Sequence, residues 1–298
     1  MKQQASKATA AILAAGSLWG TMGLFVRSLA EDDLSSVEIV FFRTFSAMIF
    51  LGAWMVLRDR SAFRIKIRDL WCFIGTGIIS LTFFNTCYFT TIQITSMAVA
   101  AILLYTSPVF VVLLSAVLFK EKLTARKLTA LVLAFAGCVF VTGVLSGGGL
   151  VMEPVGILIG IGSGFGYALY SIFGRYALER GYSSTTISFY TFVTCSLGLL
   201  ILSPFMSPVG ETIAKLAAGS TLKDILLIAG IALFVTVFPY LLYTYGLSGV
   251  ENSKAGIMAS IEPVVASILG ILIYKESLSL STLVGVVLVL GAVMLLNL

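Results

Sequence analysis

Long apolar runs alternate with short polar segments along the whole chain. A helix that crosses a lipid bilayer needs about 20 predominantly apolar residues, and most of the runs reach this length. The strict apolar-polar alternation that is typical of membrane barrel strands is missing. The pattern therefore predicts ten transmembrane helices, which cover residues 8–29, 37–57, 70–93, 97–119, 128–145, 154–175, 185–206, 224–247, 254–274 and 278–297.

The composition agrees with a protein that lies in lipid. Hydrophobic residues make up 59% of the 298 residues and charged residues 11%, and the mean hydropathy is +1.06. A soluble domain carries about 25% charged residues, so these charges are too few to cover a folded body in water. Soluble enzymes, disordered chains and secreted disulfide scaffolds are therefore excluded.

The basic residues predict the orientation of the spans. If the N-terminus lies inside, most of the 19 Lys and Arg residues fall on cytoplasmic segments, as the positive-inside rule requires. Ten spans then return the C-terminus to the cytoplasm, so we expect a multi-pass protein of the cell membrane. The pI near 9.0 is then mostly a topology signal. A nucleic-acid partner for the basic 58–68 loop is a much weaker alternative.

The chain also repeats itself. We interpret residues 1–150 and 151–298 as two repeats of five spans each, which differ by a short insertion in the 207–223 loop. Five is an odd number, so the second repeat enters the membrane from the opposite side. The shift is 155 residues in the middle of each half, where Pro108 falls on Pro263 and Lys120-Glu121 on Lys275-Glu276. It is 148 near the start, where Gly16 falls on Gly164 and Arg27 on Arg175.

Inverted repeats of this kind are a recurrent design of secondary transporters, because two like halves can exchange inward-open and outward-open shapes. The fold class expected from the sequence is therefore an all-α integral membrane protein with two inverted five-helix repeats. Duplication that was kept for packing alone is the less favoured explanation.

An ordered set of short motifs resembles a known family. The set consists of Trp19-Gly20, Phe42-Arg43, Ser107-Pro108 followed by Lys120-Glu121, and Glu262-Pro263 followed by Lys275-Glu276. It is similar to the drug/metabolite transporter superfamily and, within it, to the EamA-type family. The resemblance implies a secondary carrier, often an exporter of amino acids, metabolites or toxic organic compounds, with a central cavity between the halves.

Two alternatives to a metabolite carrier stay open from the residues. A flippase of a lipid-linked intermediate could share the same fold. A membrane-embedded enzyme that acts on lipid is much less favoured, because the chain has no His and its loops are too short for a catalytic platform. We therefore expect no enzymatic activity.

Arg43 and Glu262 are the two ionisable residues that lie clearly inside the predicted spans. Such residues are costly in a membrane and by default mark function. Arg43 either snorkels to the outer interface or faces the cavity, where it would hold a substrate carboxylate. Glu262 either ties its helix to neighbouring helices or binds a cation or a coupled proton. Their depths differ by roughly 12 Å at 1.5 Å per residue, so a direct salt bridge is not implied.

Aromatic and polar residues recur at matching places in the third and eighth spans. Residues three apart share a helix face, which predicts cavity-lining pairs suited to a small, partly apolar solute. An interfacial aromatic belt is the alternative. The predicted lining consists of Asn85 with Tyr88 and Tyr240 with Tyr243, extended by Trp19, Tyr105 and Tyr167.

Pro108 and Pro263 lie inside matching spans, where each removes one backbone donor. They are candidate hinges, with a static kink as the alternative. The absence of His and the isolation of the four Cys residues in apolar runs predict no metal site, no disulfide framework and no cofactor. Both repeats lie in one chain, so a monomer could work, and dimerisation stays open.

Overall fold

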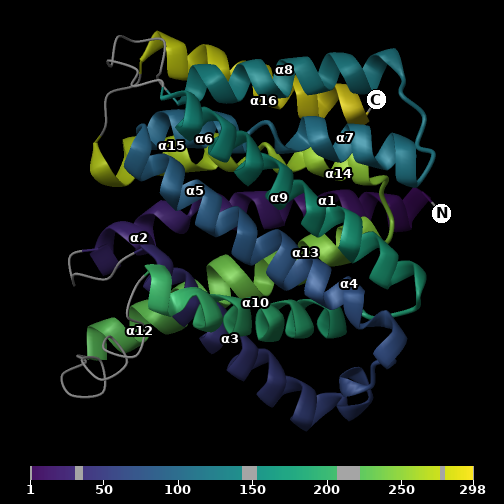
Figure 1. Ribbon diagram of the computed structural model, residues 1–298. Helices are drawn as coiled ribbons and strands as arrows, with labels where there is room; N and C mark the ends of the chain where they lie inside the picture. The colour runs from purple at the N-terminus through teal and green to yellow at the C-terminus, as the bar shows by residue number, and fades with distance from the viewer. Residues whose placement is uncertain (1, 31–35, 143–152, 207–221, 276–278, 298) are drawn as a thin grey trace.

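The computed structural model describes the chain except residues 1, 31–35, 143–152, 207–221, 276–278 and 298. The described residues form a bundle of helices that run roughly side by side (Figure 1). The first helix, α1 (Lys2–Gly20), begins at the same end of the bundle at which the last helix, α16 (Leu280–Asn297), ends. We call this end of the bundle the N/C end.

The first half holds five spans, three of which are interrupted. The first is α1 followed by α2 (Met22–Ala30), and the second is α3 (Ser36–Arg58). Two short 3₁₀ turns, η1 (Arg60–Phe63) and η2 (Ile67–Asp69), lead to the third span, which consists of α4 (Leu70–Ile74), the π-helical segment η3 (Gly75–Thr82) and α5 (Phe83–Ile94). The fourth is α6 (Met97–Leu104) with α7 (Ser107–Leu118), and the fifth is α8 (Ala125–Val141).

The second half follows the same plan. Its spans are α9 (Pro154–Glu179) and α10 (Ser184–Met206), then α12 (Leu222–Gly230) with the π-helical segment η5 (Ile231–Val237) and α13 (Phe238–Leu247). The last two are α14 (Asn252–Ala259) with α15 (Glu262–Tyr274), and α16.

The ten spans predicted from the apolar pattern are confirmed, most of them to within a few residues, although the first helix begins at Lys2 rather than at residue 8. Nine of the described helical segments are long and apolar enough to cross a membrane. The tenth, α8, has 17 described residues, and its predicted end at residue 145 lies outside the described part of the chain. The fold is an all-α bundle of two repeats of five helices.

Backbone irregularities recur 155 residues apart. The fourth span breaks at Tyr105–Thr106 and the ninth at Ser260–Ile261, while η3 and η5 occupy corresponding places in the third and eighth. Lys120 and Lys275, which follow the broken spans, both have left-handed backbones with φ of 54° and 55°, a conformation uncommon for residues other than glycine. The 155-residue shift found in the sequence is thus also present in the backbone conformation. The insertion predicted in the 207–223 loop lies almost wholly outside the described residues.

The first helix of each half packs into the other half. Helix α1 packs against α13, α14 and α15 of the second half. Helix α9 packs against α5, α6 and α7 of the first half. Glycines permit the contact: a Cβ on Gly20 would lie 2.7 Å from the Glu262 carbonyl oxygen, and one on Gly164 would lie 2.8 Å from that of Leu103. Small residues allow helices in membranes to approach this closely, so each glycine stripe presses against a broken span.

The fifth and tenth spans form a separate pair at one side of the bundle, where α8 lies along α16 (Figure 1). Gly137 and Gly285 meet backbone to backbone, since a Cβ on Gly137 would lie 2.8 Å from the Gly285 carbonyl oxygen. This pair joins the ends of the two halves. The cavities described below are lined by residues of the other spans.

Candidate functional site

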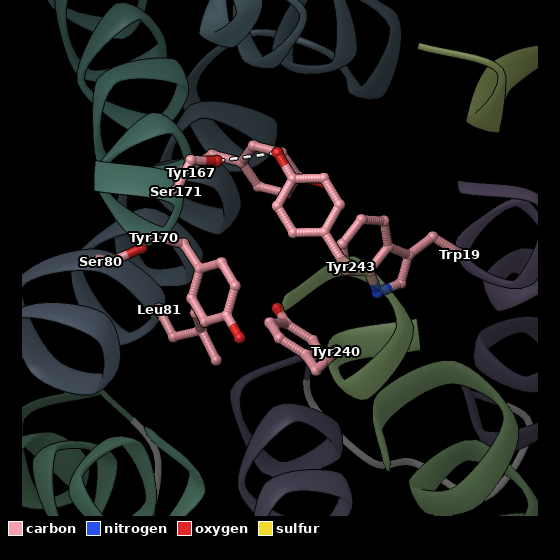
Figure 2. A pocket seen from close by; sticks show the side chains of 8 residues that line it. All are labelled: Trp19, Ser80, Leu81, Tyr167, Tyr170, Ser171, Tyr240 and Tyr243. Carbon is pink, nitrogen blue, oxygen red and sulfur yellow. Dashed lines mark hydrogen bonds between the residues drawn. The ribbon is translucent and has the colours of Figure 1, made fainter. Parts of the chain in front are cut away.

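Five aromatic side chains from three helices gather in the middle of the bundle, where the two halves interlock. We call this group the aromatic cage; it consists of Trp19 from α1, Tyr167 and Tyr170 from α9, and Tyr240 and Tyr243 from α13. The Trp19 ring lies 5.3 Å from that of Tyr240 and 5.4 Å from that of Tyr243 between centroids. Figure 2 shows these rings around a common cavity, which Ser80, Leu81 and Ser171 complete.

Hydroxyl groups fix two of the rings in the cage. The Ser171 and Tyr243 hydroxyls lie 2.8 Å apart (Figure 2), and the Tyr170 and Thr244 hydroxyls lie 2.6 Å apart. The free space inside is about 10 Å³, close to the room that one water molecule requires. The cage is therefore closed in this structure, and a solute can enter only if the helices around it move.

A second cavity contains Glu262 and lies between the two broken spans. Its free space is about 20 Å³, and Tyr167 lines both this cavity and the cage. Glu262 is the first residue of α15, where the helix dipole favours a negative charge. It is partly buried and lies within electrostatic range of Tyr88, Tyr105 and Tyr167. The other lining residues are Leu104, Tyr105, Ser107, Pro108, Gly256, Ala259 and Ser260.

Arg43 is buried inside the protein, with 3% of its surface exposed. This burial does not fit an arginine that snorkels to the interface, so that alternative is wrong. Its Nε finds no hydrogen-bond partner among the described residues, and no ion pair joins it to Glu262 there. Both groups nevertheless lie within electrostatic range of Tyr240. A buried donor without a partner is costly, but Arg43 does not line either of the two cavities in this structure, so its role in binding stays a prediction.

Asn85 and Tyr88 occupy different surroundings from those expected. Asn85 is 2% exposed, and its Nδ2 donates to the Leu81 carbonyl of its own helical span at 2.7 Å. It is absent from the lining of both cavities. Tyr88 packs on Phe84 and faces the region of Glu262 rather than the cage. The shared helix face therefore does not bring these two side chains to one cavity.

Pro108 and Pro263 lie in the first turn of α7 and α15, respectively. A proline is tolerated there because the amide group that it lacks would have no partner within the helix. The spans are therefore broken into two helices at these points rather than kinked within one. Their role as hinges stays a prediction.

Four residues that line the cage were not predicted from the sequence, namely Tyr170, Ser171, Ser80 and Leu81. For Tyr170 a signal was present: it follows Tyr167 by three residues in the same helix and so shares its face. No comparable signal marks the two serines, because a serine inside an apolar span more often bonds its own backbone.

A model of the EamA-like transporter family matches residues 6–143 and 154–298. The chain belongs to this family. The resemblance read from the motifs is thus confirmed, and the protein is a multi-pass membrane transporter of the drug/metabolite superfamily. An uncharacterized transporter of Archaeoglobus fulgidus is 32% identical over 96% of this chain and 94% of its own length. The uncharacterized transporter YwfM of Bacillus subtilis is 22% identical over 94% and 90%.

A crystal structure that is 19% identical in sequence shares the fold. It superimposes with a TM-score of 0.80 over 97% of this chain and 96% of its own chain. The arrangement of helices around the two cavities therefore occurs on a fold already seen by experiment.

Proposed function

We propose that this EamA-like transporter is a secondary active carrier that exports amino acids or related small organic solutes by alternating access. The observation that carries the proposal is the pair of helix breaks around the Glu262 cavity. Ser107 and Pro108 come from one half of the chain and Ser260 and Glu262 from the other. Broken spans at a repeat interface are the usual substrate sites of secondary transporters.

The charges around the cage favour a solute that carries both an ammonium and a carboxylate group. An ammonium is attracted by tyrosine and tryptophan rings and by the Glu262 carboxylate. A carboxylate would accept hydrogen bonds from the guanidinium of Arg43, whose Nε is otherwise unpartnered. Tyr240 lies within electrostatic range of both groups, which supports a solute that carries both charges.

Closure of both cavities around water-sized space supports a transport cycle with an occluded state. In our proposal, α1 moves with α13–α15, and α9 moves with α5–α7, because these are the helices that pack together. The breaks at Pro108 and Pro263 take up the bending. We place the N/C end in the cytoplasm, since the positively charged loop between α3 and α4 also lies there (Figure 1).

Exchange in proteoliposomes tests the proposal. Purified protein is reconstituted into liposomes that contain unlabelled amino acids, amines or related solutes. Uptake of the labelled form of each solute is then measured. We expect at least one zwitterionic solute to exchange and Glu262→Gln or Arg43→Ala to slow this exchange severely. Glu179→Gln, which changes an exposed carboxylate at the N/C end, is the matched control.

Two outcomes would contradict the proposal. If both variants exchange solute like the parent, the assigned site is wrong. If no solute moves but a fluorescent lipid changes leaflet faster than in empty liposomes, the flippase alternative replaces the carrier.

A further inference from the structure

A chain of hydrogen bonds leads from the aromatic cage to the N/C end. It begins at the Tyr243 hydroxyl, which bonds the Ser171 hydroxyl at 2.8 Å. The Ser171 carbonyl then accepts from Asn252 Nδ2 at 3.2 Å, and Asn252 Oδ1 accepts from Arg175 Nε at 3.0 Å. Asn252 is 0% exposed, so both ends of its amide are occupied by these bonds in a water-free place.

The next link crosses from one half of the chain to the other. Glu121, in the turn after α7, accepts from the backbone amides of Asn252 at 2.7 Å and Ser253 at 3.1 Å, and from the Ser253 hydroxyl. These two amides open α14, where backbone donors have no partner inside the helix. A carboxylate from the first half thus caps a helix of the second half, which satisfies its donors and its dipole.

The Glu121 carboxylate is itself held in place from two sides. The backbone amide of Glu121 donates to the Ser115 carbonyl at 3.2 Å, directly after the left-handed residue Lys120. The Lys127 ammonium lies 3.6 Å from Glu121 and 3.1 Å from Glu251, and the side chains of Lys127 and Glu121 are only 4% and 8% exposed. The Lys127–Glu251 pair joins the two halves, so separating the halves here leaves the buried Lys127 charge without that partner, which is costly.

Several partners of Glu121 differ at the repeat positions, and Glu276, the repeat mate of Glu121 itself, lies outside the described residues. The residues 155 positions before Asn252 and Ser253 are Met97 and Ala98, and the residue 155 positions after Lys127 is Thr282. Met97 and Ala98 keep the backbone amides but lack the side-chain donors by which Ser253 binds Glu121 and Asn252 binds the Ser171 carbonyl. The Asn252 side chain that leads to the cage and the Lys127 charge are therefore not repeated in the sequence of the opposite end.

We propose that Glu121 is a positioning residue that latches the N/C end shut and, through Asn252, links this closure to the aromatic cage. When a solute displaces the Tyr243 hydroxyl from Ser171, the backbone that carries Ser171 and Asn252 shifts, and the Glu121 contacts release. The proposal rests on the alternating-access function proposed above. It adds to that function a specific latch and a specific route from the cage to the latch.

Hydrogen exchange of the α14 amides tests the latch without any solute. The full-length protein in nanodiscs is followed by mass spectrometry, with attention to peptides that contain Asn252 and Ser253. Glu121→Gln loses the charge but keeps the shape, and we expect these amides to exchange about tenfold faster, because bonds to charged acceptors are stronger than neutral ones. The control Glu179→Gln should leave them unchanged. Equal exchange in the parent and in Glu121→Gln overturns the latch.

A reversible cross-link provides a second test that does not rely on a destabilised variant. Glu121→Cys and Ser253→Cys are combined in a protein whose four native cysteines are replaced, and exchange of a labelled amino-acid mixture is measured in proteoliposomes. Oxidation should reduce the exchange at least tenfold and a reductant should restore it, which a merely structural role would not explain. Unchanged transport by the oxidised pair overturns the proposal.

The two tests separate the latch from the function on which it rests. If Glu121→Gln speeds amide exchange but the parent moves none of the amino acids, the latch stands and the proposed substrate class fails. If the parent moves an amino acid while neither variant changes amide exchange or transport, the function stands and the latch fails.

Discussion

The broken fourth and ninth spans have nearly the same backbone but different chemistry. Each breaks at the same repeat position, resumes with a proline in the first turn, and ends at a left-handed lysine. At the first position of the resumed helix, however, α7 has Ser107 and α15 has Glu262, and both side chains line one cavity. The duplication therefore kept the geometry that makes a cavity, while a single residue decides its charge.

The largest expected effect comes from the charge that distinguishes the two breaks. We expect Glu262→Gln to slow solute exchange about 100-fold, because a bond to a charged group contributes about 1.5–3 kcal/mol. Ser107→Ala at the matching position should stay within about threefold of the parent, since it removes one neutral hydroxyl. Exchange rates in proteoliposomes measure both. Equal losses of exchange rate in the two variants would show that Ser107 and Glu262 contribute equally to transport, which contradicts the difference between the two breaks.

The glycines that press on the two breaks should show the opposite result, which is equality. A Cβ on Gly20 or on Gly164 would lie under 3 Å from a backbone carbonyl oxygen. Overpacking of this kind costs about 1–3 kcal/mol, so Gly20→Ala and Gly164→Ala should both melt several degrees lower in detergent. Gly23→Ala, where nothing lies within 4 Å, is the control. A variant pair that melts like this control would contradict the close packing.

The matching aromatic positions of the first helices should differ only moderately. Trp19 touches three rings of the cage, whereas Tyr167 lines both cavities. Loss of one cation–π contact costs about 1 kcal/mol, so Trp19→Leu should raise the solute concentration for half-maximal exchange about fivefold. Tyr167→Leu should have the larger effect of the two. Exchange rates measured over a series of solute concentrations give this value for both variants. A larger effect of Trp19→Leu than of Tyr167→Leu would contradict the binding of solute in both cavities.

The smallest effect is expected at the prolines. Pro108→Ala and Pro263→Ala restore one amide each in first turns where the donor has no helical partner. Melting temperatures should therefore change by less than about 1 °C, which is a few tenths of a kcal/mol for a chain of this size. If the breaks are hinges, the exchange rate should nevertheless fall by a small, equal factor in both variants. An unchanged rate in both would assign the prolines to static shape.

The spans and the place of the two proline irregularities could be predicted from the sequence because they depend on local properties, namely apolar length and the missing amide of proline. That each span breaks into two helices, rather than kinking within one, could not. The surroundings of Arg43 could not, because they depend on how spans from different halves pack. Asn85 shows a further limit. Helix periodicity assigns Asn85 to a face of its helix, but it does not show that the side-chain amide donates to the Leu81 carbonyl. This carbonyl lies near the end of a π-helical segment, which the apolar pattern does not reveal.

The cage was predicted in part for the same reason. Tyr240 and Tyr243 share a face of one helix, and this face does line the cavity. Asn252 and Glu121 could not be paired from the sequence, since they are far apart in the chain and belong to opposite halves. Polar residues in short loops are also common in any membrane protein, so nothing in their pattern distinguished these two.

The docking of α1 against α13, α14 and α15 has a consequence for biosynthesis. The ribosome makes these partners about 200 residues after α1, and contacts between residues so distant in the chain form slowly. Until then the glycine face of α1 must lie against lipid or a chaperone of membrane insertion. The N-terminal half can therefore enter the membrane early but cannot reach its native packing before translation is almost complete.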